Sequence, residues 1–203
     1  MRQAVGGAVS LFNGVDGEWT AAIAELRRDR VRFQVQARTR AQLPEPDLWL
    51  AFAPLKRDAT DWVVQKATEL GVTTILPVFT ARTNAARVNR DRLLAIAIEA
   101  AEQCERLGIP TVEPTQTLAD LLAWWPAGRH LVVAAERKDA PPIAGTAGPA
   151  ALRIGPEGGF TPAELDALRR HPFVTMASLG PRILRAETAA IVGLALLQAP
   201  AHG

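Results

Sequence analysis

Leu152-Arg-Ile-Gly-Pro-Glu-Gly-Gly-Phe-Thr161 and Ser178-Leu-Gly-Pro-Arg-Ile-Leu-Arg-Ala-Glu-Thr188 are the two stretches of sequence that decide the fold. In each stretch, glycine and proline come directly after a short apolar run and just before the residues that start a helix. In α/β folds, the ends of parallel strands and the first turns of the helices that follow them face one crevice. Two such junctions in tandem therefore predict the floor of a single ligand site.

Outward from these junctions, strand and helix patterns alternate along the chain from residue 45 onward. The expected strands are 48–53, 72–79, 111–112, 130–135, 152–154 and 173–179. The expected helices are 58–70, 89–107, 117–125, 161–170 and 187–198, with Gly71 and Gly108 as the stops of the first two. This order is typical of an α/β domain whose mostly parallel sheet is covered on both faces.

The residues before 45 have a different pattern. Residues 8–12, 19–26 and 30–38 are predicted to be strands, with glycine-containing turns between the first two, and apolar and polar residues alternate in the third. The two prolines of 42–47 mark the change to the α/β pattern. We therefore expect a small β domain over residues 1–44 and a larger domain over residues 45–203.

The strand at 30–38 predicts one apolar face and one basic face. It belongs to the run 27–40, which holds six arginines and one aspartate. A solvated edge strand explains this pattern as well as a surface that contacts nucleic-acid phosphates does. The pattern leaves both explanations open.

Composition narrows the class of protein. The 203 residues carry a net charge of +2, with one cysteine and three histidines, so an internal disulfide and a multi-cysteine metal site are excluded. We expect no bound metal, and we expect Cys104 to be a small buried residue. No apolar run is long enough to span a membrane, and the first residues lack the layout of a signal peptide. A cytoplasmic protein is expected.

The glycine-rich stretch 155–159 fits neither common phosphate-binding motif, because it lacks the P-loop lysine and the dinucleotide-binding spacing. A plain turn explains its glycines but does not require Glu157. In the second stretch, Arg182 and Arg185 flank two apolar residues, and Glu187 follows in the first helical turn. One interpretation of these residues is a loop with a helix cap and a surface ion pair. A binding site for an anionic or electron-rich substrate explains the two arginines better.

Together these segments resemble the ribosomal RNA small subunit methyltransferase E family, the 16S rRNA uridine-N3 methyltransferases of the SPOUT superfamily. The two opening stretches carry the most specific part of the resemblance. The other matching pieces, in the family's order, are Lys56-Arg57, Gln65-Lys-Ala-Thr-Glu-Leu-Gly-Val72, Ile75-Leu-Pro-Val78, Arg82, Ala101-Glu-Gln103, Arg106 and Ile109-Pro110.

The resemblance implies a fold, a cofactor and partners. Residues 1–44 would form a PUA-like β-barrel that binds RNA, and residues 45–203 a SPOUT methyltransferase domain with a deep trefoil knot. The enzyme would use S-adenosyl-L-methionine (SAM) and no metal. It would act as a homodimer, with its active site at the subunit interface, on 16S rRNA or the assembled small ribosomal subunit.

The resemblance also implies roles for individual residues. Arg185 would lie beside the base, and Glu187 would orient it or accept its proton. The expected cofactor-binding residues are Ile154, Gly155, Glu157, Gly158, Gly159, Leu179, Gly180, Ile183, Leu184, Thr188 and Ala189. The expected RNA-binding residues are Arg30, Arg32, Arg38, Lys56, Arg82, Arg106 and Arg182.

The start of the chain departs from the family pattern. Family members usually carry a further segment before the position of Met1, which would include the first strand of the barrel. We expect either a start codon upstream of Met1 or a reduced barrel. Two alternative functions remain open from the sequence: an RNA-binding module without catalysis, and a SPOUT enzyme that acts on a different RNA, such as tRNA.

Overall fold

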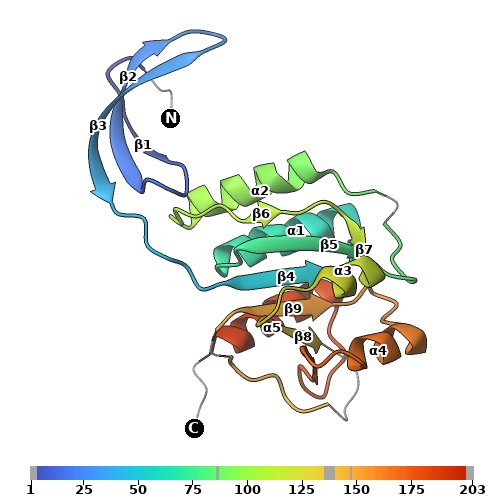
Figure 1. Cartoon of the computed structure of the whole chain (residues 1–203). Helices are drawn as coiled ribbons and strands as arrows, with labels where there is room; N and C mark the ends of the chain where they lie inside the picture. Colours follow the sequence, from blue (N-terminus) through green and yellow to red (C-terminus); the bar gives the residue numbers. More distant parts are fainter. Residues whose placement is uncertain (1–3, 86, 135–139, 147, 200–203) are drawn as a thin grey trace.

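The computed structural model describes residues 4–85, 87–134, 140–146 and 148–199 (Figure 1). Their strands form two sheets. The strands β1, β2 and β3 make a small antiparallel sheet, and seven later strands make a larger sheet in which every strand pair is parallel. The expected α/β fold with a mostly parallel sheet is therefore confirmed.

The larger sheet has the strand order β10-β8-β9-β4-β5-β6, and β7 pairs with β5. Its strands are β4 (Leu48–Phe52), β5 (Thr74–Phe79), β6 (Thr111–Val112), β7 (Gln116–Thr117), β8 (His130–Ala134), β9 (Ala150–Ile154) and β10 (Val174–Ala177). β9 lies between β4 and β8, and all five of its residues are buried. Burial on both faces explains why this strand is a nearly continuous apolar run.

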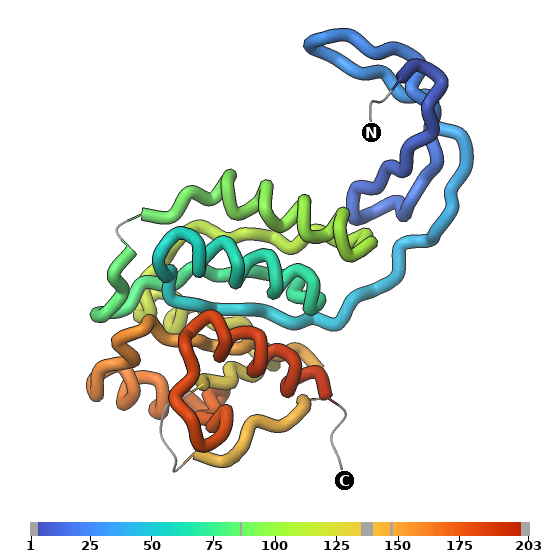
Figure 2. The backbone as a smooth tube through the Cα atoms, turned by 180° about the vertical axis from the view of Figure 1, so that it is seen from behind, coloured from blue at the N-terminus to red at the C-terminus, as the bar shows by residue number. Residues whose placement is uncertain are grey.

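Five helices cover the two faces of this sheet. They are α1 (Arg57–Glu69), α2 (Arg90–Gln103), α3 (Leu118–Trp124), α4 (Pro162–Arg169) and α5 (Ala186–Gln198). α1, α2 and α5 pack on one face, with Val63, Leu93 and Leu194 in one apolar core, and Figure 2 shows them in front of the strands. α3 and α4 cover the other face, where Leu121 and Leu168 belong to a second core.

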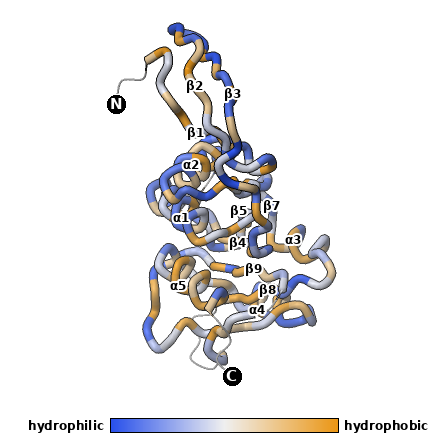
Figure 3. The backbone as a smooth tube through the Cα atoms, turned by 90° about the vertical axis from the view of Figure 1, so that its left-hand side faces the viewer, coloured by the Kyte–Doolittle hydropathy of each residue, from blue (hydrophilic) through white to orange (hydrophobic). Residues whose placement is uncertain are grey.

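The small sheet is formed by β1 (Ala8–Phe12), β2 (Glu18–Leu26) and β3 (Val31–Arg40). β3 confirms the predicted strand, with its alternating apolar and polar residues. Every residue of β3 is exposed, and Phe33 and Val35 keep 40% and 55% of their surface in solvent. Figure 3 shows the largely hydrophilic course of β3 at the far end of the molecule.

The small sheet and its linker are attached at the carboxyl end of α2 (Figure 1). The Arg106 guanidinium donates to both carboxylate oxygens of Glu45, with Nε 2.8 Å from Oε1, and also to the Thr68 carbonyl at 2.8 Å. Arg40 donates to the Glu105 carbonyl at 3.0 Å. Arg106 thus joins the linker to α1 and to the end of α2.

This junction also explains where the sequence prediction of α2 fails. The helix ends at Gln103 rather than at residue 107, because Glu105 adopts a left-handed conformation with a φ of 58°. Gly108 is not the helix stop: a Cβ there would lie 2.6 Å from Glu45 Oε2, so the glycine makes room for the linker. Cys104, expected to be buried, is exposed.

The other predicted elements agree with the structure to within one or two residues. The predicted strand residues 53, 72–73 and 178–179 lie just outside the observed strands. Residue 135, the predicted end of one strand, lies outside the described residues. In the described part of the chain, no helix is both long enough and apolar enough to cross a membrane.

We predict that Arg106→Ala lowers the free energy of unfolding by about 2 kcal/mol, because it leaves Glu45 and the Thr68 carbonyl without their shared donor in a partly buried junction. Urea unfolding measures the change. Arg169→Ala is the control: its ion pair with Asp166 is exposed, so it should cost less than about 0.5 kcal/mol. Equal costs for the two variants would contradict the junction role of Arg106.

Candidate active site

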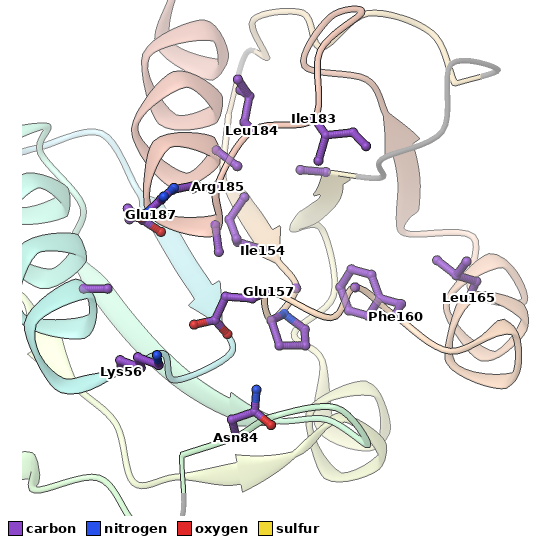
Figure 4. A pocket seen from close by; sticks show the side chains of 17 residues that line it. Lys56, Asn84, Ile154, Glu157, Phe160, Leu165, Ile183, Leu184, Arg185 and Glu187 are labelled. Atoms are coloured by element: carbon purple, nitrogen blue, oxygen red, sulfur yellow. The ribbon is translucent and has the colours of Figure 1, made fainter.

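A cavity of about 740 Å³ lies at the carboxyl ends of the parallel strands. Ile154 at the end of β9, Ala134 at the end of β8, Lys56 after β4 and Asn84 after β5 all line it, together with the segment that leads into α5. Figure 4 shows these side chains around a shared space. Both opening sequence stretches contribute to the same cavity, as the tandem junctions predict.

The first wall is the glycine loop, residues 155–159. Gly155 has no room for a side chain, because a Cβ would lie 3.0 Å from the Phe160 ring. Gly159 has a φ of 67° and donates to the Pro156 carbonyl at 2.9 Å, which closes a tight turn. Both positions favour glycine, and the turn brings the exposed Glu157 to the edge of the cavity.

Two contacts hold this loop against the segment that follows β5. Arg82 donates to the Gly158 carbonyl at 2.8 Å, and the Ala81 N–H donates to the Glu164 carboxylate at 2.8 Å. Glu164 also closes the capping box of α4 with Thr161. The glycine loop is therefore tied to a neighbouring strand end as well as to its own helix.

The charges near this loop shift each other's pKa. Partial burial would raise the pKa of Glu164, but the hydrogen bonds from Thr161 and Ala81 and the nearby Arg153 outweigh it and lower that pKa. Arg153 on β9 is completely buried, and this desolvation lowers its pKa to about 9, an effect that Glu164 partly opposes. Its guanidinium carbon lies 5.3 Å from the centre of the Phe160 ring. Arg153 thus packs beneath the glycine loop.

The second wall is the segment 178–187. Gly180 has a φ of 111°, and its N–H donates to Ser178 Oγ at 3.2 Å, so the chain turns sharply after β10. Arg185 is the N-cap residue of α5, where its side chain makes no capping bond and is exposed. Glu187 is half-buried in the first turn of α5. Figure 4 shows the two side chains close together on one side of the cavity.

Half of the predicted site residues line the cavity. They are the two predicted catalytic residues Arg185 and Glu187, the predicted RNA contact Lys56, and the predicted cofactor contacts Ile154, Gly155, Glu157, Gly159, Ile183, Leu184 and Ala189. The other predicted cofactor contacts, Gly158, Leu179, Gly180 and Thr188, belong to the same loops but not to the lining.

The remaining predicted RNA contacts are spread out. Arg82 is bonded to the glycine loop, Arg106 is nearly buried at the linker junction, and Arg182 is exposed on the second wall. The basic strand β3, with its neighbour Arg30, lies beyond the far end of α2 (Figure 1). The structure therefore brings Arg82 and Arg182 to the walls of the cavity, but it does not bring Arg106 or the arginines of β3 there within one chain.

Several lining residues were not singled out from the sequence, among them Ala59, Asn84, Phe160 and Leu165. Asn84 is a polar residue shortly after the end of β5, and this position beyond a strand end could have indicated a site residue from the sequence. The apolar residues carry no such signal, because their pattern is the same as that of core residues. Among the described residues, no group of three or more His, Cys, Asp or Glu is placed to hold a metal ion.

Comparison with known proteins defines the class. The family described as RNA methyltransferase domain matches residues 42–198, which include the whole larger sheet and both walls of the cavity. The chain is therefore an RNA methyltransferase by family. More particularly, it belongs to the ribosomal RNA small subunit methyltransferase E family, as its sequence resemblance predicted.

Relatives in sequence and structure carry this assignment. Ribosomal RNA small subunit methyltransferase E of Rickettsia conorii is 35% identical over 96% of this chain and 82% of its own length. The Bacillus subtilis protein of that name is 36% identical over 74% of this chain and 64% of its own length.

Two solved structures are also similar over nearly the whole chain. One, a Legionella pneumophila protein described as a methyltransferase and solved with bound SAM, is 32% identical, covers 97% of this chain and 84% of its own, and has a TM-score of 0.84. The other is a Neisseria gonorrhoeae ribosomal RNA small subunit methyltransferase E bound to SAM. It is 27% identical, covers 95% of this chain and 82% of its own, and has a TM-score of 0.85.

We predict that Glu164→Ala lowers the free energy of unfolding by about 1 kcal/mol at pH 7, because it removes the capping box and the contact with Ala81. The pKa of Glu164 is lowered in the folded protein, so its contribution is present above the unfolded value of 4.5 and is lost as the pH falls through the folded value. Unfolding at pH 7 and pH 3 should therefore show the difference from wild type shrinking in acid. A difference that stays constant with pH would contradict this account.

Proposed function

We propose that this chain methylates N3 of a uridine in 16S ribosomal RNA of the small subunit, with SAM as the methyl donor. The observation that carries the proposal is the single cavity in which the glycine loop meets Arg185 and Glu187. A 16S rRNA substrate follows from the family, whose members are named for the small ribosomal subunit RNA. A cytoplasmic location follows from that substrate.

The chemistry of the cavity walls fits SAM. A volume of about 740 Å³ lies in the range of cofactor sites, and Ile154, Leu184 and Phe160 offer apolar surface for the adenine ring. Glu157 offers a carboxylate for the donor's cationic groups. The residues that we propose to hold the cofactor are Ile154, Gly155, Glu157, Gly158, Gly159, Leu179, Gly180, Ile183, Leu184, Thr188 and Ala189. The Legionella and Neisseria structures were solved with bound SAM, which supports SAM as the cofactor.

When bound, SAM supplies an electrophilic methyl group. N3 of uridine is a weak acid, so it must lose its proton as it attacks. Arg185 is exposed at the cavity and would lie beside the uracil carbonyls, where its charge stabilises the developing anion. The positive end of the α5 dipole acts in the same direction. Glu187 would orient the base or accept the N3 proton.

The position of the basic strand supports a homodimer. β3 is attached at the end of α2, whereas the cavity lies toward its start, and a helix of this length separates them by about 20 Å. Ile183, at the cavity, keeps 78% of its surface in solvent, which suits contact with a partner subunit. We propose that the active site lies at the subunit interface and that Arg30, Arg32, Arg38, Lys56, Arg82 and Arg182 contact RNA. Arg106 is left out, because its donors are already bonded.

We also propose the two-domain division and the knot. Residues 1–44 would be a PUA-like RNA-binding domain, and residues 45–203 the SPOUT domain. For the knot, the support is that the β8–β9 connection is tied to Ser178 at Ile143 and to Leu197 at Thr146. The chain from β10 to α5 would then pass beneath this connection.

Arg185→Ala tests the catalytic assignment. We expect transfer to N3 of uridine to fall about 100-fold or more, because a group that stabilises the transition-state charge is lost, while SAM affinity changes less than about threefold. The measurements are nucleoside mass spectrometry of 16S rRNA or small subunits treated with the enzyme, and calorimetry for SAM.

Arg185→Lys is the matched variant and should recover part of the activity, since it keeps the charge without the planar fork. Equal losses of SAM binding and activity in Arg185→Ala would assign Arg185 to the cofactor instead. A wild-type protein that binds SAM but leaves uridine N3 unmethylated would contradict the proposed function.

A further inference from the structure

A second cavity, of about 460 Å³, lies beside the candidate active site between the start of α1, the start of α2 and the segment that precedes α2. Lys56 lines both cavities, so the two are adjacent. We call the second one the basic pocket, defined by Lys56, Arg57, Asp61, Arg87 and Arg92. None of its arginines has been given a role above.

The charge of the basic pocket is one-sided. Four of its lining side chains are cationic and one, Asp61, is acidic. Arg92 is ion-paired with Asp61, so the charge of Asp61 is neutralised by one of the four cations. Partial burial raises the pKa of Asp61, which Arg57 opposes. In the described residues, Lys56, Arg57 and Arg87 have no carboxylate oxygen within 4.0 Å, so none of the three forms an ion pair.

The backbone adds to this charge. Lys56 is the N-cap of α1 and makes no side-chain capping bond, so the N–H groups of the first turn have no side-chain acceptor from it. The first turn carries the positive end of the helix dipole next to Arg57. The cations set the preference for an anion, and the helix start strengthens it.

We infer that the basic pocket binds a backbone phosphate of the substrate RNA next to the nucleotide whose base enters the active-site cavity. This inference rests on the proposed function and specifies how the same site holds its substrate. A phosphate group matches the planar donors of arginine, and a phosphodiester carries a single charge that exposed cations can neutralise. Because Lys56 borders both cavities, one RNA strand can place a base in one and its neighbouring phosphate in the other.

The test is the double variant Arg57→Ala, Arg87→Ala, with a fragment of 16S rRNA that wild type binds. RNA affinity is measured at several salt concentrations, without turnover. We expect affinity to fall about tenfold at 0.15 M salt. The slope of log K against log salt should become shallower by about 0.7 to 0.9, which is the loss of one phosphate contact. SAM affinity should stay at the wild-type value.

The matched control is Arg169→Ala, Arg170→Ala on α4, which removes the same charge from exposed residues outside both cavities. It should leave the salt slope unchanged. The same loss in both double variants would show a general charge effect and would overturn the inference. If the alanine variant unfolds, Arg57→Gln, Arg87→Gln keeps the side-chain length and is expected to give the same change in slope.

A third arm separates RNA from free phosphate. Inorganic phosphate is titrated into wild type and into the double variant by calorimetry. Phosphate binding that depends on Arg57 and Arg87, together with an unchanged RNA slope, would assign the pocket to free phosphate and overturn the inference. Because RNA affinity is read directly, failure of the methylation assay in wild type would refute the proposed function while the salt slope still decides this inference.

Discussion

The complete burial of β9 between β4 and β8 is the constraint on which the rest of the structure depends. All strand pairs in this sheet are parallel, so the carboxyl end of β9 lies at the same edge of the sheet as those of its neighbours. The glycine loop that follows β9 therefore begins at this edge. α5 packs directly on this strand: a Cβ on Gly193 would lie 2.6 Å from the Leu152 side chain. One close contact thereby fixes both the strand that carries the glycine loop and the helix that begins with Arg185.

Further contacts turn this edge into a defined site. Arg82 and Glu164 hold the glycine loop to the segment after β5, and Arg153 packs under Phe160. Arg185 and Glu187, by contrast, are held mainly by their place in the first turn of α5. The contacts of Arg82, Glu164 and Arg153 therefore support the side of the cavity that we assign to the cofactor. The side that we assign to the RNA base is open and basic, and it is adjacent to the basic pocket.

The sequence predicts the larger sheet and its site well, because glycine, proline and capping residues act locally. Thr161 and Glu164 form the expected capping box, and the two glycine-containing junctions meet in one cavity. The errors come from contacts between distant residues. α2 ends at Gln103, where Glu105 turns the chain, and Arg106 after it binds Glu45, 61 positions away. Gly108 makes room for the same carboxylate. Local sequence patterns cannot reveal which distant residues are in contact. They also cannot reveal that Arg57 and Arg87 line the same pocket.

The central claim is that the cavity at this sheet edge is the methylation site for a uridine of the small-subunit RNA. The most direct measurement is nucleoside mass spectrometry of 16S rRNA from a strain that lacks the gene, compared with the same strain carrying the gene again. We expect N3-methyluridine to disappear in the deletion strain and to return on complementation. Retention of the full N3-methyluridine signal in the deletion strain would contradict the central claim.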